Sequence, residues 1–316
     1  MTGLLITVGE ILVEIMATTI GTGFRTPQNL VGPFPSGAPA IFIDQAGRLG
    51  APCAMIGAVG DDDFGRVNLD RLSADGVDVS AVAVHSDIAT GSAFVRYRAD
   101  GNRDFVYNIR HSASGRIAMT PEAEHVIARA SRIHVMGSAL AIPPVRMMVE
   151  RAVATIKANG GLVSFDPNVR KEMMNDAALT SALHRILAET DLFLPSGDEI
   201  LLFSQASDEQ EAARRLVANG VKEIALKRGA GGALVTDAAG TLGARALEVV
   251  EVDPTGAGDC FGATYVVCRD RGMPIEKALA YANAAGARAV TVRGPMEGAS
   301  TIADLDSFIA RAGGTA

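Results

Sequence analysis

The segment DPTGAGD at residues 253–259 combines a glycine-rich turn with a carboxylate, and a helical run follows it. Backbone N–H groups at a helix N-terminus are unpaired and carry the positive end of the helix dipole. We therefore expect Gly256, Ala257 and Gly258 to form an anion site. Asp259 would lie beside that site, where it could act as base on a hydroxyl that attacks a phosphoryl group. The dipole should keep Asp259 ionised and so only weakly basic, which suffices because phosphoryl transfer depends mostly on positioning.

The same turn has two other interpretations. Asp259 could cap the helix, because polar residues of this kind are common at helix starts. A dinucleotide site is a weaker interpretation, since a carboxylate beside the glycines would repel a pyrophosphate. The residues alone leave the helix cap and the catalytic base equally open.

Short apolar runs alternate with longer helical patterns, and together they would position this turn. The predicted strands cover residues 4–8, 54–59, 132–136, 162–165, 191–194 and 223–226. The predicted helices cover 39–49, 64–74, 144–158, 176–189, 208–218 and 274–289, together with the run after Gly258. Strands that are apolar on both faces and alternate with helices predict an α/β fold, with a central, mostly parallel sheet and helices on both of its faces.

Two segments, 11–33 and 84–116, contain few helix signals. Residues 92–98 and 104–109 alternate apolar and polar side chains, and ADGN at 99–102 is typical of a turn, so we expect a hairpin. We predict that both segments form a small β lid over the ligand crevice of a single domain. The alternative is an edge extension without a function. An edge strand of the lid could also pair with a second copy, so a homodimer is a further expectation.

Composition limits the classes of partner and the compartment. The net charge is −7, from 29 Lys and Arg against 36 Asp and Glu, and the chain has no basic tract, which argues against nucleic acid as a partner. Three cysteines in a chain of this length indicate a reducing, cytoplasmic location. The apolar start contains Glu10 and Glu14 and lacks a basic region, so it predicts a first strand rather than a signal peptide. No uncharged apolar run reaches about 18 residues, so we expect no membrane helix.

Longer motifs carry a family resemblance. DPTGAGDCFGATYV at 253–266 resembles the C-terminal signature of the ribokinase (PfkB) family of carbohydrate kinases. SGAPA at 36–40 and IGAVGDDDFG at 56–65 resemble the first signature of that family, and GEILVE at 9–14 resembles its first strand. The resemblance extends over about residues 4–300 in the order of the family. It implies a ribokinase-like fold and an ATP-dependent sugar kinase, a phosphotransferase with an alcohol group as acceptor.

The resemblance also assigns roles to individual residues. It makes Asp259 the catalytic base beside an anion hole of Gly256, Ala257 and Gly258. The residues that it assigns to the nucleotide are Lys227, Gly229, Gly232, Gly256, Gly258 and Asn283. PSGDE at 195–199 resembles the N-x-x-E motif, with Ser196 in place of Asn, and implies that Glu199 helps to position Mg²⁺. A monovalent cation such as K⁺ is a further expectation. An ordinary turn at 226–232, a solvated Glu199 and a packing role for Asn283 are the alternatives.

Three further positions depart from the family pattern. Glu14 stands where the family commonly has a sugar-binding Asp, Ile41 where it has Asn, and Thr264 where it has Gly or Ala. We still predict that Glu14, Gly37 and Asp259 bind the sugar. Ile41 cannot form a hydrogen bond, so a sugar hydroxyl that faces it would lack a partner. Thr264 lies beyond the anion hole and affects packing.

In motif the chain is closest to fructokinases, tagatose kinases and 2-keto-3-deoxygluconate kinases. DPNVR at 166–170 resembles the D-x-N-x-R of such members, and residues 101–113 resemble their lid strand. Arg110 and Arg170 could bind a substrate carboxylate, or they could hold structure. We favour a free ketohexose, tagatose or fructose, with 2-keto-3-deoxygluconate as the alternative. Aromatic residues are 5% of the chain and Trp is absent, which gives a nucleoside little support.

Two other functional classes share parts of this pattern. A nicotinamide dehydrogenase would have a parallel sheet, but its G-x-G-x-x-G after the first strand is missing here. A non-catalytic, sugar-binding regulator would lack the base, and the presence of Asp259 argues against it.

Overall fold

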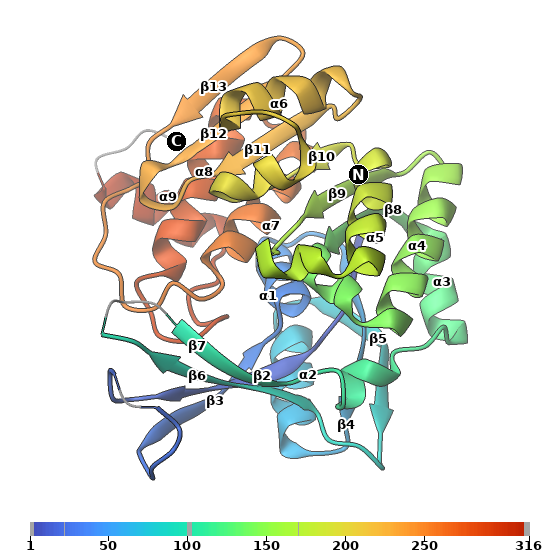
Figure 1. The fold of residues 1–316 in the computed structure, drawn as a ribbon, viewed down its shortest axis with the longest axis vertical. Helices are drawn as coiled ribbons and strands as arrows, with labels where there is room; N and C mark the ends of the chain where they lie inside the picture. The colour runs from blue at the N-terminus through green and yellow to red at the C-terminus, as the bar shows by residue number, and fades with distance from the viewer. Residues whose placement is uncertain (1–2, 22, 100–102, 170, 313–316) are drawn as a thin grey trace.

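The computed structural model describes residues 3–312, apart from 22, 100–102 and 170 (Figure 1). Its larger sheet has the strand order β13-β12-β11-β10-β9-β8-β1-β4-β5. From β5 to β11 neighbouring strands are parallel, whereas β12 and β13 are antiparallel. The strands are β1 (Leu4–Val8), β4 (Cys53–Gly60), β5 (Val77–His85), β8 (Ala130–Met136), β9 (Leu162–Asp166), β10 (Leu192–Phe193), β11 (Glu223–Lys227), β12 (Ala233–Asp237) and β13 (Gly240–Ala244).

Helices flank this sheet on both faces, which confirms the predicted α/β fold class. The α-helices are α1 (Ala38–Arg48), α2 (Asp63–Ala74), α3 (Pro121–Arg129), α4 (Pro143–Ala158), α5 (Ala177–Ala188), α6 (Glu209–Ala218), α7 (Ala257–Asp270), α8 (Ile275–Ala289) and α9 (Ile302–Arg311). Short 3₁₀ turns are η1 (Ala113–Arg116), η2 (Gly137–Ala141), η3 (Lys171–Asn175), η4 (Gly197–Phe203) and η5 (Gly229–Gly231). Helix α7 packs against both α1 and α8, so its N-terminus is held between elements from opposite ends of the sequence (Figure 1).

A smaller sheet lies at one end of the molecule, below the larger one in Figure 1. It contains β2 (Leu12–Ala17), β3 (Leu30–Ser36), β6 (Gly91–Tyr97) and β7 (Arg103–Asn108), in the order β3-β2-β6-β7. The predicted hairpin is confirmed, because β6 and β7 pair antiparallel from Ser92↔Asn108 to Tyr97↔Arg103. Most of its predicted turn, residues 100–102, lies outside the described residues. At the ends of the two predicted segments, residues 84 and 85 belong to β5 of the larger sheet, and 113–116 form η1.

Every predicted strand and helix is present, with ends that differ by a few residues. The sequence did not predict β5, β12, β13, α3 or α9. Strand β5 alternates between buried and exposed side chains irregularly, and β12 and β13 form a hairpin at the sheet edge. None of the helices in the described part of the chain is long and apolar enough to cross a membrane.

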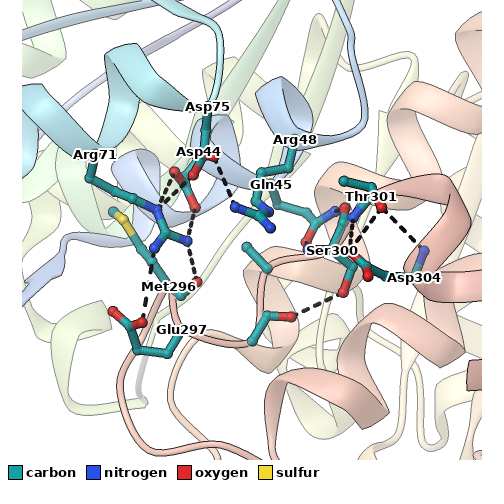
Figure 2. Close-up of polar contacts among 12 residues, drawn as sticks. Asp44, Gln45, Arg48, Arg71, Asp75, Met296, Glu297, Ser300, Thr301 and Asp304 are labelled. Carbon is teal, nitrogen blue, oxygen red and sulfur yellow. Dashed lines mark hydrogen bonds and ion pairs between the residues drawn. The ribbon is translucent and has the colours of Figure 1, made fainter.

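A buried polar cluster, which we call the support network, joins the C-terminal segment to α1 and α2 (Figure 2). It consists of Asp44, Gln45, Arg71, Met296 and Ser300. The Arg71 guanidinium donates to both carboxylate oxygens of Asp44, at 3.1 and 3.2 Å, and to the Met296 carbonyl at 2.6 Å. The Gln45 side chain donates to the Ser300 carbonyl at 2.9 Å and accepts from the Ser300 N–H at 2.8 Å. The network therefore fixes residues 296–300 against the helix that lies beside the glycine-rich turn.

Candidate active site

The glycine-rich turn has a backbone that only glycine adopts easily. Gly256 is the N-cap of α7, with φ at 81° in the left-handed region. A Cβ atom at this position would lie 2.3 Å from the Pro295 carbonyl oxygen. Asp253 fixes the approach, because its carboxylate accepts from Thr255 N and Oγ1 at 3.1 and 2.7 Å and from Gly294 N at 3.0 Å. The first N–H groups of α7 are thereby held in a fixed orientation at the helix N-terminus, as an anion site requires.

Asp259 lies in the first turn of α7 and is half-buried beside Gly258, which lines a cavity. Burial raises the pKa of Asp259 to about 7; Asp166 raises it further, and Lys227 partly opposes the shift. The expectation that the helix dipole keeps Asp259 a weak base is therefore wrong, since burial outweighs the dipole. A carboxylate with a pKa near neutrality is a more effective proton acceptor than an ordinary Asp.

A cavity of about 710 Å³ opens on one side of the turn. The predicted nucleotide residues that line it are Lys227, Gly229, Gly232, Gly258 and Asn283, whereas Gly256 acts as the N-cap behind it. Its apolar walls include Leu247, Val249, Phe261 and Val290, which the sequence analysis missed. Leu247 and Val249 lie in a segment without regular structure, which gives no periodic signal. The cavity thus combines apolar walls with the polar turn at one end, a shape that suits a nucleotide.

Asn283 forms part of the cavity wall and also braces it. Its side-chain amide donates to the Arg245 carbonyl at 3.2 Å and, more weakly, to the Ala244 carbonyl at 3.5 Å. These bonds hold the start of the segment that carries Leu247 and Val249. Asn283 therefore has the packing role that the sequence left open and lines the predicted nucleotide site as well.

Lys227 ends β11 and forms a buried ion pair with Asp166 at the end of β9. The side chains are 10% and 3% exposed, and the other Asp166 oxygen accepts from Asn168 N at 3.1 Å. Although burial alone would lower the pKa of Lys227, the nearby Asp166 and Glu199 raise it, so the ammonium keeps its charge. A Cβ atom placed on Gly258 would lie 3.5 Å from Lys227 Nζ, so the ammonium lies beside the anion turn.

Glu199, the predicted magnesium residue, accepts hydrogen bonds from two backbone amides. Its Oε1 accepts from Val169 N at 3.0 Å and its Oε2 from Ser196 N at 2.8 Å. The second bond belongs to a capping box at the start of η4. Burial and the nearby Asp166 raise the pKa of Glu199 to about 7. Glu199 therefore orders two loops at the edge of the site.

Glu14 lies on the other side of Asp259, on β2. It is 7% exposed; its Oε1 accepts from Ser36 Oγ at 2.9 Å, and its Oε2 has no partner among the described residues. Glu10, at the end of β1, is also 7% exposed with an Oε2 that no described group bonds. Burial raises the pKa of each to about 7, and both raise the pKa of Asp259. The sequence analysis did not select Glu10, although its place at the end of the first strand was a usable signal.

Gly37 makes this side of the site compact. It is the N-cap of α1 with φ at 111°, and a Cβ atom there would lie 2.5 Å from the Glu10 carbonyl oxygen. The start of α1 therefore packs directly on the end of β1, beside Glu10 and near Glu14.

The predicted arginines contribute less than expected. Arg110 is exposed and donates to the Ala141 carbonyl at 3.0 Å, which is the structural alternative, and Arg170 lies outside the described residues. A different arginine reaches the turn: Arg103 of β7 donates to Thr255 Oγ1 at 2.5 Å. This contact joins the smaller sheet to the anion turn across 152 positions of sequence, so no local pattern predicts it.

Ile41 is a buried residue of α1. Its side chain is 2% exposed, belongs to the hydrophobic core and would lie 3.2 Å from a Cβ atom at Gly256. Ile41 therefore packs against the turn, and its expected effect on a sugar hydroxyl stays a prediction. Thr264 is fully buried in α7, in keeping with a packing role.

Comparisons with known proteins agree with this geometry. The model of the pfkB family carbohydrate kinases matches residues 6–302. The 2-dehydro-3-deoxygluconokinase of Thermoproteus tenax is 32% identical, over 93% of this chain and 90% of its own length. The fructokinase of Klebsiella pneumoniae is 34% identical, over 83% and 87%. The solved structure of a "putative Ribokinase II" of E. coli in complex with ATP and Mg²⁺ is 47% identical, with a TM-score of 0.92 over 98% of this chain and 99% of that one. The match excludes the dehydrogenase alternative, and the chain is a carbohydrate kinase of the PfkB family, a phosphotransferase with an alcohol group as acceptor.

Proposed function

We propose that this kinase transfers the γ-phosphoryl group of ATP to a hydroxyl of a free ketohexose, tagatose or fructose. The observation that carries the proposal is the place of Asp259, next in sequence to Gly258 of the cavity lining and within electrostatic range of Glu14, whose Oε2 has no partner among the described residues. A hydroxyl bound at Glu14 would point toward Asp259, and a phosphate in the cavity would meet the N-terminus of α7. The 2-keto-3-deoxygluconate kinase activity is the alternative.

In this proposal the chemistry is a direct transfer. Asp259 accepts the proton of the sugar hydroxyl, and the oxygen of that hydroxyl forms a bond to the γ-phosphorus. The bond between that phosphorus and the bridging oxygen breaks, and its electron pair leaves on ADP. The N–H groups at residues 256–258 stabilise the charge on the transferring group. Because the pKa of Asp259 is about 7, the base is substantially ionised at neutral pH.

The metal role of Glu199 belongs to the proposal as well. Mg²⁺ prefers a few carboxylates combined with water and substrate phosphates, and it needs no cage made only of protein. The described residues contain no cluster of three ligands for a metal, and Glu199 supplies one carboxylate within electrostatic range of Lys227, which lines the cavity. This donor set fits a magnesium ion that enters with the nucleotide and neutralises phosphate charge. For K⁺ we assign no ligands; activity in potassium against sodium chloride tests the expectation.

Charge favours a neutral acceptor over a sugar acid. Glu10, Glu14 and Asp259 converge on the acceptor side, and each would repel a substrate carboxylate when ionised. Among the described cations, Arg103 bonds Thr255 and Arg110 bonds the Ala141 carbonyl. Pairs of carboxylates bind neighbouring sugar hydroxyls well, since ionised acids accept strong hydrogen bonds. A ketohexose therefore suits the site better than a keto acid.

We propose further that the smaller sheet closes on bound sugar as a lid and pairs two copies through an edge. Arg103 links it to the anion turn, so closure would also order the residues that bind phosphate. Strand β7 is one edge of the sheet and exposes Val106 and Tyr107, at 57% and 56%. Slower hydrogen exchange at residues 92–110 on sugar binding tests closure. Light scattering of the parent and of Val106→Glu tests the dimer.

A sugar panel coupled to ADP release tests the proposed acceptor. The panel contains tagatose, fructose, ribose and 2-keto-3-deoxygluconate, with identical enzyme, ATP and Mg²⁺ concentrations. We expect the highest kcat/KM with a ketohexose. A preference of more than about tenfold for the keto acid would replace the proposal with its alternative.

A further inference from the structure

Lys227 has an ammonium group that its protein neighbours do not fully use. An ammonium has three N–H donors. One donates to Asp166, and the described residues supply no second acceptor within hydrogen-bond distance. The side chain is only 10% exposed, yet it lines the cavity of about 710 Å³. A buried ammonium needs hydrogen-bond partners, so we infer that a group bound in that cavity accepts from the remaining donors.

The backbone holds Lys227 at the mouth of the anion turn. Lys227 N donates to the Pro195 carbonyl at 2.9 Å, and the residue forms a parallel bridge with Ser196. On one side of the ammonium lies Asp166, and on the other lies Gly258, where an added Cβ atom would be 3.5 Å away. The α7 amides and the ammonium thus approach the same space from different elements.

The local charge favours a fixed cation there, in addition to the proposed Mg²⁺. Asp166, Glu199 and Asp259 all lie within electrostatic range of Lys227. Three carboxylates would repel the γ-phosphate of ATP, and the N-terminus of one helix supplies only a partial positive charge. A fixed ammonium offsets this repulsion most strongly when charge moves toward the transferring oxygens.

We propose that Lys227 is a catalytic residue that binds the transferring phosphoryl oxygens, and that Asp166 is a positioning residue that aims its ammonium. The proposal rests on the proposed phosphoryl transfer and goes beyond nucleotide binding. Lys227 keeps its proton throughout; the proton of the acceptor goes to Asp259, and the electron pair of the broken bond goes to ADP. Its contact strengthens as the β–γ bond breaks, so it should affect kcat more than ATP affinity.

Four variants test the proposal: Lys227→Met, Asp166→Asn, the double variant that combines them, and Lys222→Met as control. Lys222 is a paired lysine with a side chain that is 69% exposed, far from the cavity lining. We expect Lys227→Met to lower kcat about 100-fold and the affinity for ADP with aluminium fluoride by a similar factor. ATP affinity should fall less than about tenfold, and Lys222→Met should match the parent. Asp166→Asn should lower kcat less than Lys227→Met and leave ATP affinity nearly unchanged.

The double variant separates catalysis from structure. Lys227→Met alone leaves a buried, unpaired Asp166 and could unfold the protein, whereas the double variant removes both charges. If Lys227 only neutralises Asp166, the double variant will recover parental kcat, and the proposal is overturned. The proposal would also be overturned if Lys227→Met lost affinity for ATP and for ADP with aluminium fluoride by the same factor. If the parent enzyme phosphorylates none of the sugars, only the proposed acceptor is contradicted. The affinities for ATP and for ADP with aluminium fluoride still test the role of Lys227.

Discussion

Two buried polar regions of this protein flank the glycine-rich turn and differ in how their groups are bonded. Behind the turn, in the support network, Asp44 accepts on both oxygens from Arg71, and Gln45 uses both ends of its amide on Ser300 (Figure 2). In front of it, Glu10 and Glu14 each leave one carboxyl oxygen without a partner in the described part of the chain. Asp44 and Gln45 are fully buried, and Glu10 and Glu14 are each 7% exposed.

The difference shows which region waits for a ligand. A buried polar atom without a hydrogen bond costs free energy, so proteins keep few of them unless a ligand completes the bonding. In the support network both carboxylate oxygens of Asp44 and both ends of the Gln45 amide have partners, so these groups serve the fold. The carboxyls in front of the turn are incomplete, and the sugar hydroxyls that we propose would supply the missing donors. Substitutions in the two regions should therefore have opposite consequences.

Removal of an arginine from the support network should have the largest effect, and on stability. Arg71→Ala leaves Asp44 buried without its partner, which we expect to cost about 3–5 kcal/mol of unfolding free energy. Urea denaturation measures it, with Arg66→Ala on the same helix as control, since the Arg66 side chain is 61% exposed. The folded fraction of Arg71→Ala should keep its sugar KM. A loss below about 1 kcal/mol would mean that the network contributes little.

Removal of the base should have the next largest effect, on turnover alone. Asp259→Asn keeps the shape of the site but accepts no proton, so kcat should fall about 100-fold or more. Calorimetry should find sugar and ATP affinities nearly unchanged. The matched control is Asp63→Asn, an aspartate in the first turn of α2 with a side chain that is 96% exposed. Turnover of Asp259→Asn within a few-fold of the parent would make Asp259 a helix cap.

Substitution of Glu14 should have a smaller effect on activity than loss of the base. Unlike Arg71→Ala, it should not lower the stability of the protein. Glu14→Gln keeps the bond from Ser36 but loses the charge that grips the sugar, so the sugar KM should rise about tenfold while the ATP KM stays constant. Burial raises the pKa of Glu14 from 4.5 to about 7, so its ionisation opposes folding, and stability is lost progressively as the pH rises from about 4.5 to about 7. The variant should therefore melt at the same or a higher temperature than the parent at about pH 8, with a smaller difference at about pH 5. A lower melting temperature at both pH values would place Glu14 with the structural residues.

The smallest of these effects is expected for Asn283, on the KM for ATP. Asn283→Ala removes the bond to the Arg245 carbonyl, which is worth about 1 kcal/mol, so the ATP KM should rise about fivefold. The sugar KM serves as the internal control and should not move. An unchanged ATP KM would show that the wall of the cavity holds without this amide.

Local signals explain how much of this site could be predicted from the sequence. The turn at 253–259 joins glycines, a carboxylate and a helix start within seven positions, and the hairpin at β6 and β7 combines alternation with a turn motif. Both are confirmed as local structures, because short-range geometry alone specifies them. The α/β order was also readable, since each buried strand is followed by a helix pattern.

The missed features depend on contacts between distant segments. Lys227 meets Asp166 across 61 positions, and Arg103 meets Thr255 across 152. The motif around Ile41 gave no sign that this side chain packs in the core and against Gly256. The pKa of Asp259 was misjudged because a helix dipole can be inferred from sequence, whereas burial cannot.

The pH dependence of kcat tests the central claim, that Asp259 is the base of a site left incomplete for its substrates. With the preferred sugar, ATP and Mg²⁺ saturating, the account predicts that kcat falls about tenfold per pH unit below the pKa of Asp259, which is about 7 in the protein without ligands. In Asp259→Asn the residual turnover should lack this limb. A parent profile that stays flat from about pH 5.5 to about pH 8.5 would contradict the claim.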